Sequence, residues 1–260
     1  MPKDQISLRQ LLMLLFAALL SPMIQVLPRE TVMLAGKAGW LSALAALPLI
    51  LLLAWAFQTA PGKLGDGCGM AEGLEAAFGP WIARGLVVLY LVWGVLLLGW
   101  NTRWCAYRAL SVNYRNAPMP LFILALLVLT LWLGHKSLSA FSRAGEIFAL
   151  ALGSALLLAL MLATLRTEWN NVGPIWVEDL PGAVGGVLPV LGLAGYGVLG
   201  AFQAGQVKRR EENRGRLLRW GGLWCALLAA FQLICIGCFG PGLLRRMETP
   251  FFMLLRGVGV

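Results

Sequence analysis

The sequence predicts an all-α, polytopic helical membrane protein. Of its 260 residues, 59% are hydrophobic and only 13% are charged, and the mean hydropathy is +0.77. This composition is typical of chains that lie in hydrocarbon. The apolar residues also gather in runs near the roughly 20 residues that an α-helix needs to cross about 30 Å of bilayer. We therefore expect one transmembrane domain over residues 1–260.

Seven apolar runs predict seven spanning helices, and an eighth helix begins near the end of the sequence. The runs cover 8–27, 38–57, 81–104, 119–134, 144–164, 184–205 and 217–239, and the eighth helix starts within 250–260. Most tryptophans fall near the ends of these runs, where indole rings find the headgroup level of a bilayer. The first run lacks a small-residue cleavage site, so we interpret it as a span and not as a signal peptide.

The distribution of Lys and Arg favours a cytoplasmic N-terminus. In that orientation the cytoplasmic segments collect more Lys and Arg than the outer ones, and "KRREENRGRLLR" (208–219) is the strongest basic segment. The net charge of +9 is then a property of membrane topology, and no nucleic-acid partner is expected. Contact of segment 208–219 with anionic membrane lipid is an alternative to a simple charged loop.

Sequence patterns typical of catalysis or metal binding do not occur. There is no G-x-S-x-G, no H-E-x-x-H and no P-loop, so we do not expect an enzyme. The chain has a single histidine, His135, and Cys235-x-x-Cys238 has neither a second cysteine pair nor a histidine nearby. We therefore expect no metal site and no cofactor, and we interpret these thiols as small hydrophobic groups in a helix.

Glu146 is the acidic residue nearest to the interior of a predicted span. It follows Arg143 by three residues, and side chains at this spacing are neighbours on one helix face. The sequence therefore predicts a structural ion pair between Arg143 and Glu146 at a helix end. The spans lack the chain of buried acids that a proton pump uses.

Helix-breaking residues interrupt two of the predicted spans. Ser21-Pro22 lies inside the first run, and a proline within a helix costs about 3 kcal/mol. In the sixth run Pro189 is followed by Gly192, Gly195, Gly197 and Gly200. Irregular backbone is tolerated in a bilayer only where it is buried in protein or lines a cavity. Paired breaks of this kind indicate the midplane site of an inverted-repeat transporter.

We expect both helices to be unwound near the midplane, around Ser21–Met23 and Gly192–Gly197, and to face each other. A small-molecule site would lie between the breaks, with Tyr90 of the third span closing one wall, because ligand sites between helices are mostly apolar with a few polar groups. The candidate ligand-binding residues are Ser21, Pro22, Met23, Tyr90, Gly192, Ala194, Gly195 and Tyr196.

Several short motifs resemble, in order and spacing, those of one known family. They are "ISLRQ" (6–10), which is also a helix capping box, "LP" (27–28), "AGWLSALAA" (38–46), "GHKSLSAFSRAGEIF" (134–148), "NNVGPIW" (170–176) and "FGPGLLRRMETPFFMLLRGV" (239–258). Together they resemble the spore-germination permeases, the B subunits of germinant receptors in the amino acid–polyamine–organocation (APC) superfamily.

This resemblance implies a LeuT-like inverted-repeat fold with broken helices one and six. Such a fold has five helices in each repeat, so 8–164 supplies the first repeat and 184–260 supplies an incomplete second repeat. We therefore expect that the chain alone is not a working transporter. The family usually has Gly-x-Gly at the first break, whereas this chain has Ser21-Pro22-Met23, and Pro22 offers no N–H to a substrate carboxylate.

The resemblance also implies a transporter-like membrane subunit of a spore germinant receptor. Such a subunit senses or binds an amino acid or a similar small nutrient, has other receptor subunits as partners, and lies in the cell membrane, which in a spore is the inner membrane. Two alternatives are a secondary active amino acid transporter driven by Na⁺ or H⁺, and a membrane scaffold with a degenerate pocket. The missing buried acid favours the sensor.

Overall fold

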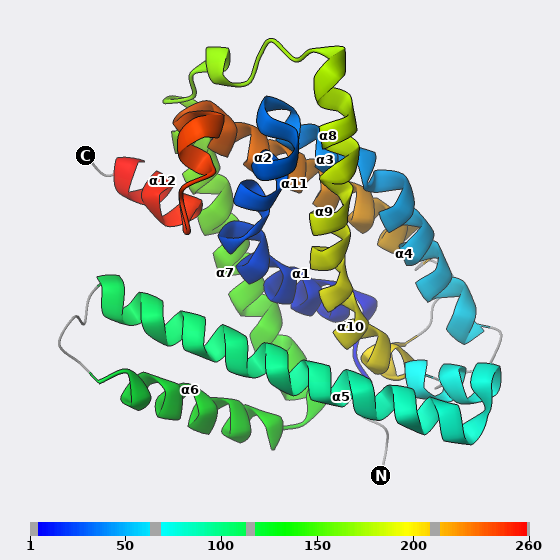
Figure 1. Cartoon of the computed structure of the whole chain (residues 1–260). Helices are drawn as coiled ribbons and strands as arrows, with labels where there is room; N and C mark the ends of the chain where they lie inside the picture. Colours follow the sequence, from blue (N-terminus) through cyan, green and yellow to red (C-terminus); the bar gives the residue numbers. More distant parts are fainter. Residues whose placement is uncertain (1–4, 63–68, 113–117, 209–213, 259–260) are drawn as a thin grey trace.

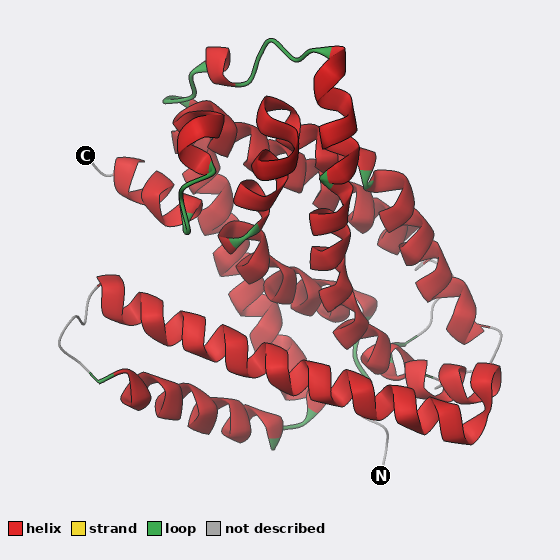
Figure 2. Cartoon of the chain, in the orientation of Figure 1, coloured by secondary structure: helices red, strands yellow, loops and turns green. Residues whose placement is uncertain are grey.

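A computed structural model describes residues 5–62, 69–112, 118–208 and 214–258, and within them the chain is helical and has no strand (Figures 1 and 2). The elements, with η for 3-10 helices, are α1 (Leu8–Gln25), α2 (Leu27–Ala35), η1 (Gly36–Trp40), α3 (Leu41–Ala45), α4 (Leu47–Gly62), α5 (Met70–Val112), α6 (Met119–Gly134), α7 (Leu138–Thr164), η2 (Trp169–Asn171), η3 (Val177–Asp179), α8 (Leu180–Gly185), α9 (Val187–Ala194), η4 (Gly195–Gly197), α10 (Val198–Gln203), η5 (Ala204–Gln206), α11 (Arg214–Leu244) and α12 (Pro250–Val258). The prediction of an all-α polytopic protein is confirmed.

Six helical segments of the described chain are long and apolar enough to cross a membrane. They are Leu8–Gln25, Leu27–Ala56, Met70–Leu110, Leu138–Thr164, Val177–Gln206 and Gly215–Leu244. The helix α6 is equally apolar but has 16 residues, which corresponds to about 24 Å at 1.5 Å per residue. The protein is thus an integral membrane protein.

The main hydrophobic core forms around α11. This helix packs against α2, η1, α3 and α4, and its fully buried side chains include Leu228, Phe231 and Ile236. Met23 of α1 is fully buried in the same cluster. Burial of apolar side chains on one helix by four neighbouring elements makes α11 the centre of the fold.

Glycines allow α1 and α7 to pack closely. A Cβ atom on Gly145 would overlap the side chain of Leu14, and one on Gly153 would lie 3.4 Å from a ring carbon of Phe16. Small residues at a helix contact let two backbones approach in a membrane, where packing rather than the hydrophobic effect drives association. This contact places the start of α1 beside the start of α7.

The contact between α1 and α7 also determines the partner of Glu146. Glu146 forms an ion pair with Arg9 of α1, whereas the guanidinium of Arg143 reaches back along α7 and donates to the carbonyl and the hydroxyl of Ser139. The predicted Arg143–Glu146 pair is therefore wrong. A tertiary neighbour replaced the partner that local helical spacing suggested.

The first span is interrupted later than expected. Residues Ser21–Met23 are helical, since the N–H of Val26 donates to the carbonyl of Pro22 at 3.0 Å and Gln25 Nε2 donates to Ser21 Oγ at 2.7 Å. The expectation of unwinding at Ser21–Met23 is wrong, because Pro22 removes only one backbone bond while the polar side chains beside it satisfy each other. The helix ends at Gln25, and α2 begins at Leu27.

The sixth span is tightened rather than unwound. Its glycine-rich part is divided into α9, η4 and α10, and Gly195 (φ −55°, ψ −29°) and Gly197 (φ −59°, ψ −22°) keep right-handed helical angles. The interruption therefore falls where the sequence places it, but its form is a turn of 3-10 helix. The expected loss of helical structure over Gly192–Gly197 is corrected accordingly.

Backbone hydrogen bonds tie the first span to the end of the sixth. The N–H of Ile6 donates to the carbonyl of Gln206 at 3.0 Å, and the N–H of Lys208 donates to the carbonyl of Ile6 at 3.0 Å. Ile6 is fully buried. The capping box predicted in "ISLRQ" follows at once, with Gln10 N donating to Ser7 Oγ at 3.2 Å and Ser7 N donating to Gln10 Oε1 at 3.0 Å.

Lys37 anchors the connection between α7 and α8. Its Nζ donates to the carbonyls of Asn170 at 3.1 Å and Gly173 at 3.0 Å, and Asn171 Nδ2 donates to the carbonyl of Gly237 at 2.9 Å. The connection is thus bonded both to η1 and to α11.

We expect Lys37→Met to loosen this connection, because the substitution keeps the length of the side chain and removes both donated bonds. Amide hydrogen exchange over 168–176 should become at least about tenfold faster, because a hydrogen bond from a charged donor contributes about 1.5–3 kcal/mol. Lys136→Met, at the other end of α7, serves as the control and should leave this exchange unchanged. Unchanged exchange in Lys37→Met would show that the anchor lies elsewhere.

Candidate functional site between α1 and the sixth span

The candidate site lies where α1 packs along α9, η4 and α10. Gly200 of α10 explains the close approach, because a Cβ there would lie 2.7 Å from Leu15 Cδ2. Gly200 is buried, so its role is helix packing. The two interrupted spans are therefore in direct contact.

The other glycines of the sixth span have a different environment. A Cβ on Gly192, Gly195 or Gly197 would meet no atom within 4 Å, leaving aside chain neighbours and the local helix backbone. Helix packing therefore does not explain them. The N–H of Val198 is directed at the carbonyl of Gly195, which is the i to i+3 pattern of a 3-10 turn. A 3-10 turn within a longer helix often marks a hinge or a functional site.

Two aromatic pairs join α5 to this region. The ring of Tyr196 in η4 meets Trp93 edge to face with centroids 6.1 Å apart, and the ring of Phe202 in α10 meets Tyr90 edge to face at 5.8 Å. Tyr90 and Trp93 are three residues apart and share one face of α5. This face of α5 packs beside the tightened turn.

The structure brings together only part of the predicted site. Met23, Ala194 and Tyr196 pack on one hydrophobic cluster. Ser21 and Pro22 are half-buried in the same helix as Met23, and Gly192 and Gly195 border the open space described above. The aromatic ring partner of Tyr90 is Phe202.

Sequence reasoning did not include Trp93, which contacts Tyr196. Its position in the sequence could have identified it as a site residue. Trp93 lies at the centre of a predicted span, whereas most tryptophans of this chain lie near span ends. An indole far from the headgroups needs a partner for its N–H within the protein or from a ligand.

The polar groups at this site are neutral. They include the hydroxyl of Ser21 with the amide of Gln25 bonded to it, the hydroxyl of Tyr196, the indole N–H of Trp93 and the backbone of Gly195–Gly197. A hydrogen-bonding ligand would be held by dipoles and aromatic faces, which suits a small polar or zwitterionic molecule better than a strongly charged one.

The architecture defines a class: an integral membrane protein with two interrupted spans packed on each other. Residues 5–214 match the family described as spore germination protein, the spore permeases. The match covers well over half of the chain, so the chain belongs to the spore germination permease family, and the resemblance seen in its motifs is confirmed for those that lie within 5–214. Comparison with curated proteins and with solved structures found no match. The protein is a germination-related, permease-like membrane protein.

Proposed function

We propose that this chain is the transporter-like subunit of a spore germinant receptor and binds a small nutrient, such as an amino acid, between α1 and η4. It would lie in the spore inner membrane with its N-terminus in the cytoplasm, beside other receptor subunits. The observation that carries the proposal is the tightened turn Gly195–Gly197, which borders open space and packs against α1.

Three features of the turn support binding of a small molecule. Its backbone N–H groups can donate hydrogen bonds to a ligand and its carbonyls can accept them, because the internal hydrogen bonds of a 3-10 turn have poorer geometry than those of an α-helix. Gly195 and Gly197 carry no side chain that would block the approach. Tyr196 and Trp93 supply aromatic faces and two polar groups beside it.

The charges favour sensing over ion-driven transport. Glu146 is the one acidic residue within the predicted spans, and it forms an ion pair with Arg9 at the start of α1. Acidic residues that couple transport to a proton normally lie inside the bundle. We therefore expect nutrient binding without concentrative uptake when the purified chain is placed in liposomes. Robust, saturable uptake of a labelled amino acid would favour the secondary transporter instead.

We expect Tyr196→Ala to weaken the nutrient response roughly tenfold, because the substitution removes a hydroxyl and an aromatic face at the site. The measurement is the concentration of germinant that gives half-maximal germination of spores carrying the variant. Tyr107→Ala is the matched control, since Tyr107 also packs edge to face on a tryptophan, Trp104, but is exposed elsewhere on α5. Small and equal effects of the two substitutions would argue against this site.

A further inference from the structure

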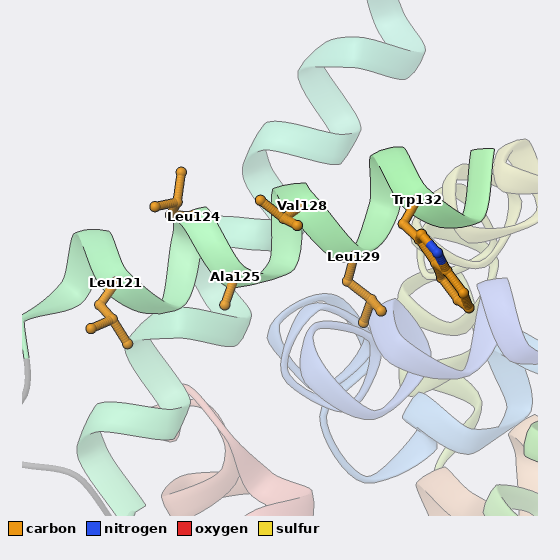
Figure 3. A pocket seen from close by; sticks show the side chains of 6 residues that line it. All are labelled: Leu121, Leu124, Ala125, Val128, Leu129 and Trp132. Carbon is orange, nitrogen blue, oxygen red and sulfur yellow. The ribbon is translucent and has the colours of Figure 1, made fainter. Parts of the chain in front are cut away.

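One face of α6 forms an apolar groove. A shallow, open hollow of about 540 Å³ lies along it (Figure 3). The side chains that line it come from one helix face: Leu121, Leu124, Ala125, Val128, Leu129 and Trp132. We refer to these six residues as the α6 groove. From Leu121 to Trp132 it extends about 16 Å at 1.5 Å per residue.

The groove is exposed because α6 belongs to a helical hairpin at one side of the molecule. The helices α5 and α6 lie side by side and antiparallel, and α5 contacts the rest of the protein mainly through α4 and α10 (Figure 1). No residue of α6 is buried. Leu124 is 64% exposed and Trp132 is 57% exposed.

A basic turn adjoins the Trp132 end of the groove. The Nζ atom of Lys136 lies 4.7 Å from the centroid of the Trp132 ring. Arg143 folds its guanidinium back towards this turn, where it donates to the carbonyl of Ser139 at 3.3 Å. We refer to Lys136 and Arg143 as the basic turn.

The basic turn keeps its positive charge. Glu146 is the acidic residue of this region, and it pairs with Arg9. Among the described residues neither Lys136 nor Arg143 has a carboxylate partner. Ser137 also begins α7 here, with its hydroxyl accepting from Ala140 N at 3.3 Å, so the positive end of the helix dipole lies at the same place.

We propose that the α6 groove and the basic turn together bind an anionic phospholipid. One acyl chain lies along the groove, and the phosphate lies beside Lys136 and Arg143. Trp132 stands at the boundary between the two, as indole rings do at the headgroup level of a bilayer. Lys and Arg at a span end are common in membrane topology, but here two of them adjoin the end of an apolar groove, so an anionic headgroup is complementary to this place. This inference does not depend on the nutrient site.

The test is native mass spectrometry of the full chain in detergent with added dioleoyl phosphatidylglycerol or dioleoyl phosphatidylcholine at equal concentration. We expect phosphatidylglycerol to remain bound several-fold more than phosphatidylcholine. Lys136→Gln with Arg143→Gln should lower retention of phosphatidylglycerol at least about fivefold and leave phosphatidylcholine unchanged, because a single cation near an anionic lipid already contributes about that factor. Equal retention of the two lipids by the natural chain would overturn the proposal.

Three further arms separate the alternatives. Arg29→Gln is the charge control, because Arg29 lies on α2, twenty residues beyond Arg9, the residue of α1 that pairs with α7. It should leave retention of phosphatidylglycerol unchanged. A loss equal to that of the double variant would overturn the proposal.

Ala125→Phe fills the groove and should lower retention of phosphatidylglycerol while the melting temperature of the protein stays unchanged. Glycerol 3-phosphate should not displace the lipid, because it has the phosphate but no acyl chain. Displacement would show that the site binds the phosphate group alone and would overturn the role of the groove. A contrary result would be a dimer of the natural chain that Ala125→Phe abolishes, together with equal retention of the two lipids. This result would overturn the proposal and would show that the groove is an interface between two copies of the chain.

Discussion

Gly182→Ala is expected to be among the most destabilising single-methyl substitutions in this protein. A Cβ at Gly182 would lie 2.5 Å from the carbonyl oxygen of Leu34 and 3.0 Å from the Cα of Ala35. Both atoms belong to the backbone at the end of α2, so no side chain can rotate away. Overpacking of this kind costs about 1–3 kcal/mol. In a chain of this size, the melting temperature in detergent should fall by about 5 °C or more.

The same helix supplies the control for this substitution. A Cβ on Gly185 would meet nothing within 4 Å, although Gly185 lies only three residues further along α8. Gly185→Ala should leave the melting temperature unchanged or raise it slightly, because alanine favours a helix over glycine by about 1 kcal/mol. Equal melting temperatures of the two variants would mean that α8 does not pack against the end of α2 as described.

Gly195→Leu should abolish nutrient binding without unfolding the protein. The backbone of Gly195 is helical, and the space at its Cβ position is open, so the new side chain fits the fold. The same side chain would occupy the volume in which we place the nutrient. We expect the affinity to fall roughly a hundredfold, the upper end of what a few methylene groups achieve in a shaped pocket. Titration calorimetry with a panel of amino acids measures this change.

The control is Gly99→Leu, since Gly99 of α5 also has nothing within 4 Å of its Cβ position. This variant adds the same apolar volume away from the site and should bind like the natural chain. A melting temperature that falls only in Gly195→Leu would indicate packing at that position. Unchanged affinity in a stable Gly195→Leu variant would exclude the site from the space beside η4.

The predicted helix bounds were most accurate where helix-starting or helix-ending residues, such as proline and glycine, coincide with the ends of an apolar run. The fourth run, 119–134, matches the bounds of α6, because Pro118 precedes the run, Pro120 lies in its first turn, and Gly134 and His135 close it. The third run, 81–104, is shorter than α5, which extends over 70–112. At Gly79 the backbone is non-helical (φ 80°, ψ 166°), so α5 consists of two helical parts, and the run begins just after this break, at Trp81. At the other end the helix continues past the apolar run to Val112, where hydropathy does not detect it.

The candidate site was predicted less completely, since its details depend on tertiary contacts. Ser21 and Gln25 bond to each other, so the helix persists past Pro22. Trp93 reaches Tyr196 only because α5 packs beside the sixth span. Local patterns show where a helix is weak, but the neighbouring helices determine whether it opens, bends or tightens.

The bonds between Ile6 and the end of the sixth span have a mechanical consequence. A 3-10 helix rises about 2.0 Å per residue and an α-helix about 1.5 Å, so conversion of Gly195–Gly197 to α-helix would shorten the span by about 1.5 Å. Ile6 is bonded on both sides of Val207 and is fully buried, so it must follow that displacement. A ligand that changes the pitch of η4 therefore pulls on the N-terminal segment of the chain. A pair of distance probes, one near residue 5 and one on α9, would measure this displacement of about 1.5 Å across η4 and α10.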